Sequence, residues 1–423
     1  MKFCQVFRKP IFISLSPNVQ RDDIKLAFKL IFKPSLWKNG KANKTLKEKF
    51  KNYLEAKYAF SFNSGRSSLI AILDALDIRK GNEVLIQAFT CNAVVNPILE
   101  RGAKPIFVDI DETLNLDPQD LKQKITNHSK AIIIQHTFGW PAQIDKILKI
   151  AKENNLYLIE DCAHSLGAKH QGEKIGTFGD AAFFSFGRDK VISSVFGGIA
   201  VTNNKKIASK IKKFQEGLPY PLNSWIFQQL LHPILTRYLV LPAYFISNSF
   251  GRIIIGLLHK LSILSKAVYK EEKRGKFSKH FPKKMPNVFS ILALNQFKKM
   301  NEFNNHRKKI ADFYEKELKN KGITLPFLNR LNGDIPCYMR YPILVELNTD
   351  EILKKAQKRK IFLNDGWRKS PVVPLDTDLV SMQYLKGSCL KAEKTAESII
   401  NLPTHINTSK KDAQKIINFL NQF

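Results

Sequence analysis

Short apolar runs alternate with helical patterns between about residues 57 and 204. The runs are rich in β-branched and aromatic residues and comprise 83–88, 104–110, 131–137, 156–161 and 181–186. Amphipathic stretches such as 67–77 and 143–155 separate them. Short apolar strands connected by helices are typical of parallel sheets that are covered on both faces. The pattern therefore predicts an α/β fold with a central, mostly parallel sheet and helices on both of its faces.

Polar residues follow three of these runs. His136, Asp161 and Ser185 each lie at or near the end of a predicted strand. In open parallel sheets, ligands bind beyond the carboxyl ends of the strands. These three residues therefore lie where a sheet of this type binds its ligands.

The chain changes character between residues 217 and 267, where apolar residues dominate. Arg237 and Arg252 are the only Lys or Arg residues between residues 217 and 259, and prolines interrupt the apolar pattern. No uncharged run between the prolines and the arginines reaches the ~20 residues that are needed to span a bilayer. A lysine-rich stretch follows and ends at Lys284.

The C-terminal part combines helical and strand-like patterns. A long helical pattern over 287–320 precedes a strand-like run at 338–347, a helical one at 350–359 and a terminal helix at 411–423. This order predicts a smaller α+β domain. The predicted division is an N-terminal segment with the large domain over 1–214, an apolar and then basic insertion over 215–284, and the small domain over 285–423.

The charge balance is strongly basic, with 68 Lys and Arg residues against 37 Asp and Glu residues and a formal charge of +31. Such a charge favours anionic partners, although an A+T-rich coding sequence explains the lysine excess equally well. No helix-turn-helix or zinc-finger spacing is present, so we expect no nucleic-acid binding.

The cysteines and the first residues bear on the compartment. Five cysteines are scattered without CxxC pairs, which predicts no metal site and no disulfide framework and fits a cytoplasmic setting. The N-terminal stretch over 1–15 lacks a small-residue cleavage site, so we interpret it as mature protein and not as a signal peptide.

Three motifs could carry chemistry. Ser64, Gly65 and Arg66 open an apolar helix, whose N-terminus would attract an anion, although a plain helix cap has the same appearance. Asp161 ends a strand that we expect to be buried, where a carboxylate requires a partner, unless it lies in a surface turn. His164 follows in the same loop.

The third motif centres on Lys190. Phenylalanines precede this lysine and Val191 and Ile192 follow it. Burial would lower the pKa of its ammonium group and favour attack on an aldehyde, although most such lysines extend to water. A lysine, a carboxylate and an anion site are together what pyridoxal phosphate (PLP) requires of a protein.

These blocks, in this order, resemble the DegT/DnrJ/EryC1/StrS family of PLP-dependent sugar aminotransferases. The matching blocks include SGRSSL (64–69), LIEDCAHSLGA (158–168), GTFGDAAFFSF (176–186) with the following lysine, GGIAVTNN (197–204) and IINLPTH (399–405). The resemblance covers most of the chain outside about 215–284. It implies the fold-type I architecture and PLP as the cofactor.

The resemblance also implies roles for single residues. Lys190 is the Schiff-base lysine and the proton shuttle, and Asp161 pairs with the pyridine nitrogen. Ser185 and the SGRS block, with Ser64, Gly65 and the backbone of Arg66, hold the phosphate. His164 occupies the position near the 3′-oxygen where the family usually has glutamine.

Two further positions depart from the family pattern. Arg66 stands where threonine is usual and could add a charged contact to the phosphate. Cys91 stands where an aromatic residue commonly covers the cofactor ring, and Phe89 is a candidate substitute. The Asn-containing segment that reaches the partner subunit in the family has no clear match before residue 287.

The implied reaction transfers an amino group, with L-glutamate as donor, to a keto group of a nucleotide-linked sugar in surface polysaccharide or glycoconjugate biosynthesis. The resemblance implies a homodimer.

Two alternatives to this function stay open. One is a PLP-dependent sugar dehydratase, in which the lysine is replaced, so that Lys190 argues against it. The other is a non-catalytic, regulatory membrane-surface protein with the same fold.

The segment over 224–284 is not explained by the resemblance. Its apolar residues could pack on the protein's own core or on a dimer partner, as amphipathic helices commonly do. Since the family core is complete without it, its apolar surface needs another place to be buried. We expect it to dock on an anionic membrane surface, which would place the enzyme at the cytoplasmic face.

Overall fold

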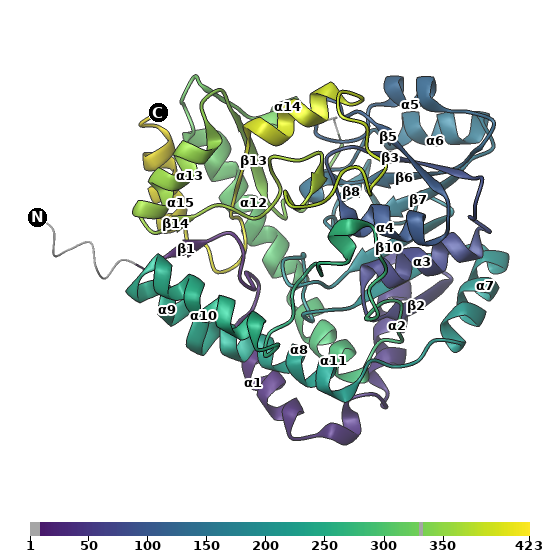
Figure 1. Cartoon of the computed structure of the whole chain (residues 1–423), viewed down its shortest axis with the longest axis horizontal. Helices are drawn as coiled ribbons and strands as arrows, with labels where there is room; N and C mark the ends of the chain where they lie inside the picture. Colours follow the sequence, from purple (N-terminus) through teal and green to yellow (C-terminus); the bar gives the residue numbers. More distant parts are fainter. Residues whose placement is uncertain (1–8, 330–332) are drawn as a thin grey trace, which may run out of the picture.

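Seven strands form the central sheet of the computed structural model, which describes residues 9–329 and 333–423 (Figure 1). Their spatial order is β2 (Tyr58–Phe62), β11 (Gly198–Thr202), β10 (Ala181–Ser185), β7 (Tyr157–Asp161), β6 (Ser129–Gln135), β3 (Glu83–Gln87) and β5 (Lys104–Val108). β11 is antiparallel to both of its neighbours, and the remaining neighbouring pairs are parallel. The predicted mostly parallel sheet is confirmed. The expectations for the first eight residues, Cys4 included, lie outside the described residues.

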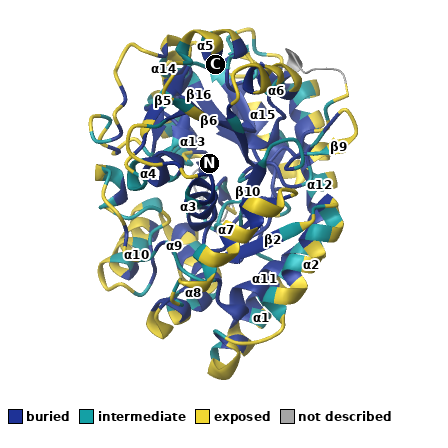
Figure 2. Cartoon of the chain, turned by 90° about the vertical axis from the view of Figure 1, so that its right-hand side faces the viewer, coloured by how far each residue is buried: buried dark blue, intermediate teal, exposed yellow. Residues whose placement is uncertain are grey.

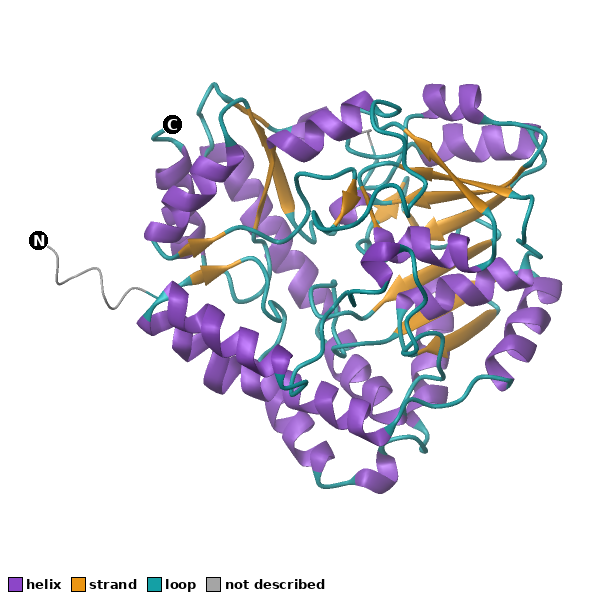
Figure 3. Ribbon diagram, viewed as in Figure 1, coloured by secondary structure: helices purple, strands orange, loops and turns teal. Residues whose placement is uncertain are grey.

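Helices cover both faces of this sheet (Figure 3). The chain moves toward one edge through α3 (Gly65–Ala75) and α4 (Asn92–Glu100), and it moves back through α5 (Pro118–Lys124) and α6 (Ile144–Glu153). Because crossovers between parallel strands are right-handed, the two directions place these pairs of helices on opposite faces. α7 (Lys205–Glu216) packs against α3 and extends its layer.

The core lies between these layers. Every residue of β3 and β11 is buried, and α3 is buried at all positions except Arg66 and Asp74. Figure 2 accordingly shows α3 in dark blue at the centre of the molecule. Because α3 is buried on nearly every side, it has no continuous solvent-facing side and forms an internal layer of the molecule.

The C-terminal part is an α+β unit, as predicted. Its antiparallel sheet has the order β12 (Ile323–Thr324), β13 (Tyr341–Val345), β16 (Ile399–Leu402). Its helices are α11 (Asn287–Phe297), α12 (Met300–Glu317), α13 (Thr349–Lys358), α14 (Leu390–Ser398) and α15 (Lys410–Leu420).

The predicted helix over 287–320 is wrong in one respect, because it is two helices. The Lys299 amide bonds to the Gln296 carbonyl, which tightens the turn and interrupts the α-helical ladder. The Lys299 ammonium group lies 2.9 Å from Asp22 and 3.0 Å from Asp23, which adds a tertiary contact at the break. Helical spacing alone does not reveal such a contact.

Short strands connect distant parts of the chain. β1 (Ile11–Phe12) pairs with β14 (Ile361–Phe362), so the N-terminal segment lies against the C-terminal unit. β4 (Thr90–Cys91) pairs with β15 (Val372–Val373). β8 (Lys169–His170) and β9 (Glu173–Lys174) form a hairpin, and α1 (Arg21–Ile31) and α2 (Ala42–Leu54) precede the sheet. The predicted domain boundaries stay a prediction.

The middle segment is helical and then irregular. It contains α8 (Asn223–Leu235), a π-helical stretch (Thr236–Val240), α9 (Leu241–Ile246) and α10 (Asn248–Lys260). Among the described residues, no helix has the length and apolar character that crossing a membrane requires.

Candidate active site

The carboxyl ends of β6, β7 and β10 meet at one edge of the sheet. Asp161, the last residue of β7, stands in register with Gln135 of β6 and Phe183 of β10. Ser185 ends β10, and Lys190 follows in the loop beyond it. The structure thus places Asp161, Ser185 and Lys190 on the predicted edge.

The N-terminus of α3 faces the same edge. A Cβ atom on Gly65 would lie 2.9 Å from the Ser185 Cβ atom, and one on Gly198 would lie 2.5 Å from the Gly65 nitrogen. Only glycine permits this close approach. Among the described residues, the Gly65 and Arg66 amides have no acceptor, so two N–H groups and the helix dipole are available to an anion.

The side chains of Ser64 and Arg66 are engaged elsewhere. The Ser64 hydroxyl caps α3 by accepting a hydrogen bond of 3.1 Å from the Ser67 amide. The Arg66 guanidinium pairs with Glu272, donates to the Ala267 carbonyl and lies 4.1 Å from the ring centre of Phe281. Phosphate contacts from this block therefore fall to the backbone.

Asp161 is a buried carboxylate. Within the described residues its one hydrogen bond comes from the Ala163 amide at 2.9 Å, and it has no ion pair. Burial raises the pKa of Asp161, while that hydrogen bond and the charges of Lys190 and His136 oppose the rise. A buried carboxylate with so few partners is suited to face a cationic ligand atom.

Lys190 is half-buried, and burial lowers the pKa of its ammonium group to about 8. Two hydrogen bonds fix the main chain at and after Lys190. The Asn18 side chain donates to the Lys190 carbonyl at 2.5 Å, and the buried Arg307 side chain donates to the Val191 carbonyl at 2.7 Å. These two supports come from distant segments, and no local motif indicated them.

His164 is buried and neutral. Burial and the neighbouring charges of Lys190 and Arg340 hold its pKa well below the usual value. Its Nδ1 atom accepts from the Phe138 amide at 3.4 Å, so the neutral ring carries its proton on Nε2. Nε2 is therefore a donor, as a glutamine side-chain amide would be.

Aromatic rings enclose His164. Phe138 stacks on it with a centroid distance of 5.8 Å, and Trp367 contacts its edge at 4.9 Å. Phe89 is fully buried against both of these rings. Cys91 precedes α4 and caps it, because its sulfur accepts a hydrogen bond from the Ala93 amide, and burial raises the pKa of its thiol.

Arg340 was not predicted from the sequence. It is buried beside Phe138 and forms ion pairs with Asp365 at 2.8 Å and with Asp189 at 3.9 Å. Its charge acts on both Lys190 and His164. No sequence signal marked Arg340. It directly precedes β13, and an arginine in front of a strand is commonly exposed.

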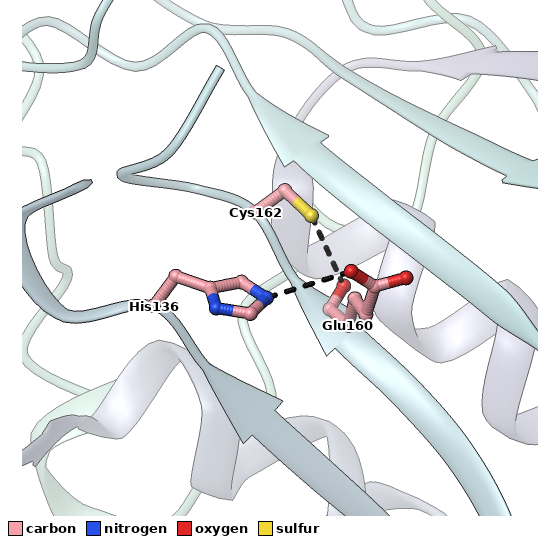
Figure 4. Close-up of side chains that lie close together, drawn as sticks. All are labelled: His136, Glu160 and Cys162. Atoms are coloured by element: carbon pink, nitrogen blue, oxygen red, sulfur yellow. Dashed lines mark hydrogen bonds and ion pairs between the residues drawn. The ribbon is translucent and has the colours of Figure 1, made fainter. Parts of the chain in front are cut away.

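His136, Glu160 and Cys162 form a buried cluster behind the site that has the side chains of a metal centre, and its members also make contacts within the fold (Figure 4). Glu160 accepts from three amides, those of Gly176, Phe178 and Gly179, at 2.7–2.8 Å. The His136 Nδ1 atom accepts from the Ala142 amide, which directs its Nε2 toward Glu160 at 3.5 Å. Burial raises the pKa of the Cys162 thiol well above its usual value. The cluster anchors a loop to the sheet.

Residues 18–218 and 257–421 match the DegT/DnrJ/EryC1/StrS aminotransferase family. The chain belongs to this family. The internal part outside the match, 219–256, is shorter than the predicted insertion over 215–284.

Curated relatives extend the comparison. A protein of unassigned function from Methanocaldococcus jannaschii is 31% identical over 384 residues, which cover 89% of this chain and 88% of the relative. The GDP-perosamine synthase of Escherichia coli O157:H7 is 40% identical over 195 residues, which cover 45% of this chain and 54% of that enzyme.

The fold agrees with solved structures. The Helicobacter pylori aminotransferase PseC, involved in the biosynthesis of pseudoaminic acid, superimposes with a TM-score of 0.74 at 23% identity and covers 98% of this chain and 99% of its own. This likeness confirms the predicted fold-type I architecture of this family member.

A cavity of about 680 Å³ opens elsewhere in this aminotransferase, between the N-terminal segment and α9. Its walls include Phe12, Arg21, Leu241 and His405. None of the predicted site residues lines it, so the chemistry of the strand edge does not depend on this cavity.

Proposed function

We propose that this aminotransferase binds pyridoxal phosphate through Lys190 and moves an amino group from L-glutamate to a keto group of a nucleotide-linked sugar. One observation carries the proposal. Lys190, whose pKa is lowered, and Asp161, a buried carboxylate without an ion pair among the described residues, lie at the same edge of the sheet. The names of the relatives, which include GDP-perosamine synthase, support the acceptor class and a place in surface polysaccharide or glycoconjugate biosynthesis.

The residues present fit the cofactor. The close approach at Gly65 and Gly198 leaves two free amides for a phosphate, beside the Ser185 hydroxyl. Asp161 would hold the positive charge of the pyridine nitrogen, and the His164 Nε2–H would donate to the 3′-oxygen. When bound, pyridoxal phosphate supplies an electron sink for the bond that breaks at the amino-bearing carbon.

The chain's own groups supply the proton chemistry. At mildly alkaline pH, near 8, about half of the Lys190 side chains are the neutral amine, because burial lowers the pKa of this group to about 8. A neutral amine can attack a carbonyl and can accept a proton from carbon. Asp161, kept from water, stays available to a cation. Arg340 would bind an anionic group of a substrate, since its planar guanidinium suits carboxylates and phosphates.

The predicted homodimer and cytoplasmic setting are also part of the proposal. The described cysteines Cys91, Cys162, Cys337 and Cys389 are all free, which supports a reducing compartment. Light scattering of the purified holoenzyme tests the dimer by its mass.

To test the function, the holoenzyme is incubated with L-[15N]glutamate and a panel of GDP- and dTDP-linked keto sugars. The masses of the products are measured by mass spectrometry. We expect the label to appear in one nucleotide-linked amino sugar. Lys190→Ala should abolish the transfer, and Lys205→Ala, at an exposed lysine on α7, should leave it unchanged.

Two failures are distinguishable. Exchange of nitrogen with glutamate but transfer to none of the sugars would contradict the acceptor class. A holoenzyme that does not exchange nitrogen with any amino acid would contradict the transaminase assignment itself.

A further inference from the structure

Helix α10 is apolar on two sides. Its inward residues Ile254, Ile255 and Leu258 pack in a small cluster with Val240, Tyr244 and Leu264. Its outward side carries a second row, here called the apolar stripe, with exposed fractions of 40%, 57%, 48% and 65% for Phe250, Ile253, Leu257 and Leu261. The spacing of three and four residues places these four on one line along the helix.

The apolar stripe lies at the periphery of the molecule. Figure 1 shows α9 and α10 side by side at its outer edge. α9 adds Phe245 and Ile246, which are 42% and 70% exposed. Single exposed apolar residues are ordinary, but a row continued by a neighbouring helix marks a surface that a partner covers.

The charges that the segment 217–270 itself carries have one sign. The sequence contains no Asp or Glu between residues 217 and 270, although the chain has 37 of them. Arg237, Arg252 and Lys260 are exposed on the π-helical stretch and on α10. A segment that combines exposed apolar residues with exposed cations and has no acid of its own complements a surface that is apolar inside and anionic outside.

A second copy of the chain does not suit this surface. In a symmetric dimer the same patch meets itself, so Arg252 and Lys260 of one copy would face a segment of the other copy that has no carboxylate of its own to pair with. Part of this surface, with α9 and the residues Phe250, Arg252 and Ile253 of α10, lies in 219–256, outside the family match.

We propose that the apolar stripe and the exposed cations of the same segment, Arg237, Arg252 and Lys260, dock this enzyme on the surface of a bilayer that contains anionic phospholipid. Helices of this type lie in the plane of the interface, with the apolar row in the acyl region and the basic residues at the headgroups. The inference is independent of the reaction, because none of these residues belongs to the candidate active site.

The test is flotation of the full-length holoenzyme with two kinds of vesicle, phosphatidylcholine alone and phosphatidylcholine mixed with phosphatidylglycerol. We expect binding to the mixed vesicles and little to the neutral ones. Arg252→Gln with Lys260→Gln should lower the partition coefficient about 25-fold at low salt, from the usual contribution of a basic residue near an anionic surface.

Ile253→Ser with Leu257→Ser should also release the protein from the mixed vesicles. The matched control is Val380→Ser with Leu385→Ser, two residues of an unrelated loop that are 84% and 74% exposed, and it should bind as the wild type does. All three variants should keep wild-type cofactor absorbance, which shows that the enzyme is folded.

Three outcomes would overturn the proposal. They are equal binding to neutral vesicles, undiminished binding of the Ile253→Ser, Leu257→Ser variant, and loss of a dimer in that variant as measured by light scattering. The last result would assign the apolar stripe to a second copy of the chain.

Discussion

Replacing Gly65 by alanine should weaken cofactor binding while leaving the protein folded. The new Cβ atom would lie 2.9 Å from the Ser185 Cβ atom, which belongs to a strand and moves little. Relief of this contact requires a displacement of roughly 0.5–1 Å of the α3 N-terminus, since ordinary carbon contacts are longer. The amides of Gly65 and Arg66 would move with it, away from the phosphate position.

The expected magnitude follows from those two amides. Hydrogen bonds to charged groups contribute about 1.5–3 kcal/mol each, so losing about half of both costs roughly 1.5–3 kcal/mol, or about ten- to hundred-fold in Kd. The assay is equilibrium titration of the apo protein with pyridoxal phosphate, followed by absorbance.

Gly256→Ala provides the matched control. Gly256 lies on α10 with no atom within 4 Å of an added Cβ, so alanine there should raise helix stability by about 0.5–1 kcal/mol and leave Kd unchanged. Urea unfolding of both variants separates binding from stability. If Gly65→Ala binds pyridoxal phosphate as tightly as the wild type, the α3 N-terminus is not the phosphate site.

Three further predictions concern the strand edge. Asp161→Asn should still bind the cofactor but lower kcat by about 10²–10³-fold, as the loss of a preorganised charge does, and near-normal turnover would place the pyridine partner elsewhere. The rate at which the apo protein captures pyridoxal phosphate should rise about tenfold per pH unit and level off near pH 8, because only the neutral Lys190 amine attacks; a plateau reached only above pH 10 would contradict the lowered pKa. His164→Gln should retain at least about tenfold more activity than His164→Leu, since only glutamine keeps a donor, and equal rates would refute a hydrogen bond from Nε2.

The sequence predicted the sheet well because its strands are local. Each strand is a short apolar run, and burial on both faces leaves a pattern that needs no distant information. Asp161 and Ser185 could be placed for the same reason, since strand ends in a parallel sheet share one edge. Lys190 lies five residues beyond its strand, and the family resemblance singled it out.

The supports of the site could not be predicted in this way. Arg340 acts on Lys190 from the C-terminal unit, and Asn18 holds the Lys190 carbonyl from the N-terminal segment. These contacts join residues far apart in the chain, and no periodicity records them. The Arg66 side chain shows the same limit, because its partner Glu272 lies in the segment that the resemblance did not explain.

The most direct test of the account is to identify the lysine that holds the cofactor. Holoenzyme is reduced with borohydride, digested and mapped by mass spectrometry, with Lys190→Ala treated in parallel. The account predicts a phosphopyridoxyl group on Lys190 and none in the variant. The same group on a different lysine, or equal labelling of the Lys190→Ala variant, would contradict it.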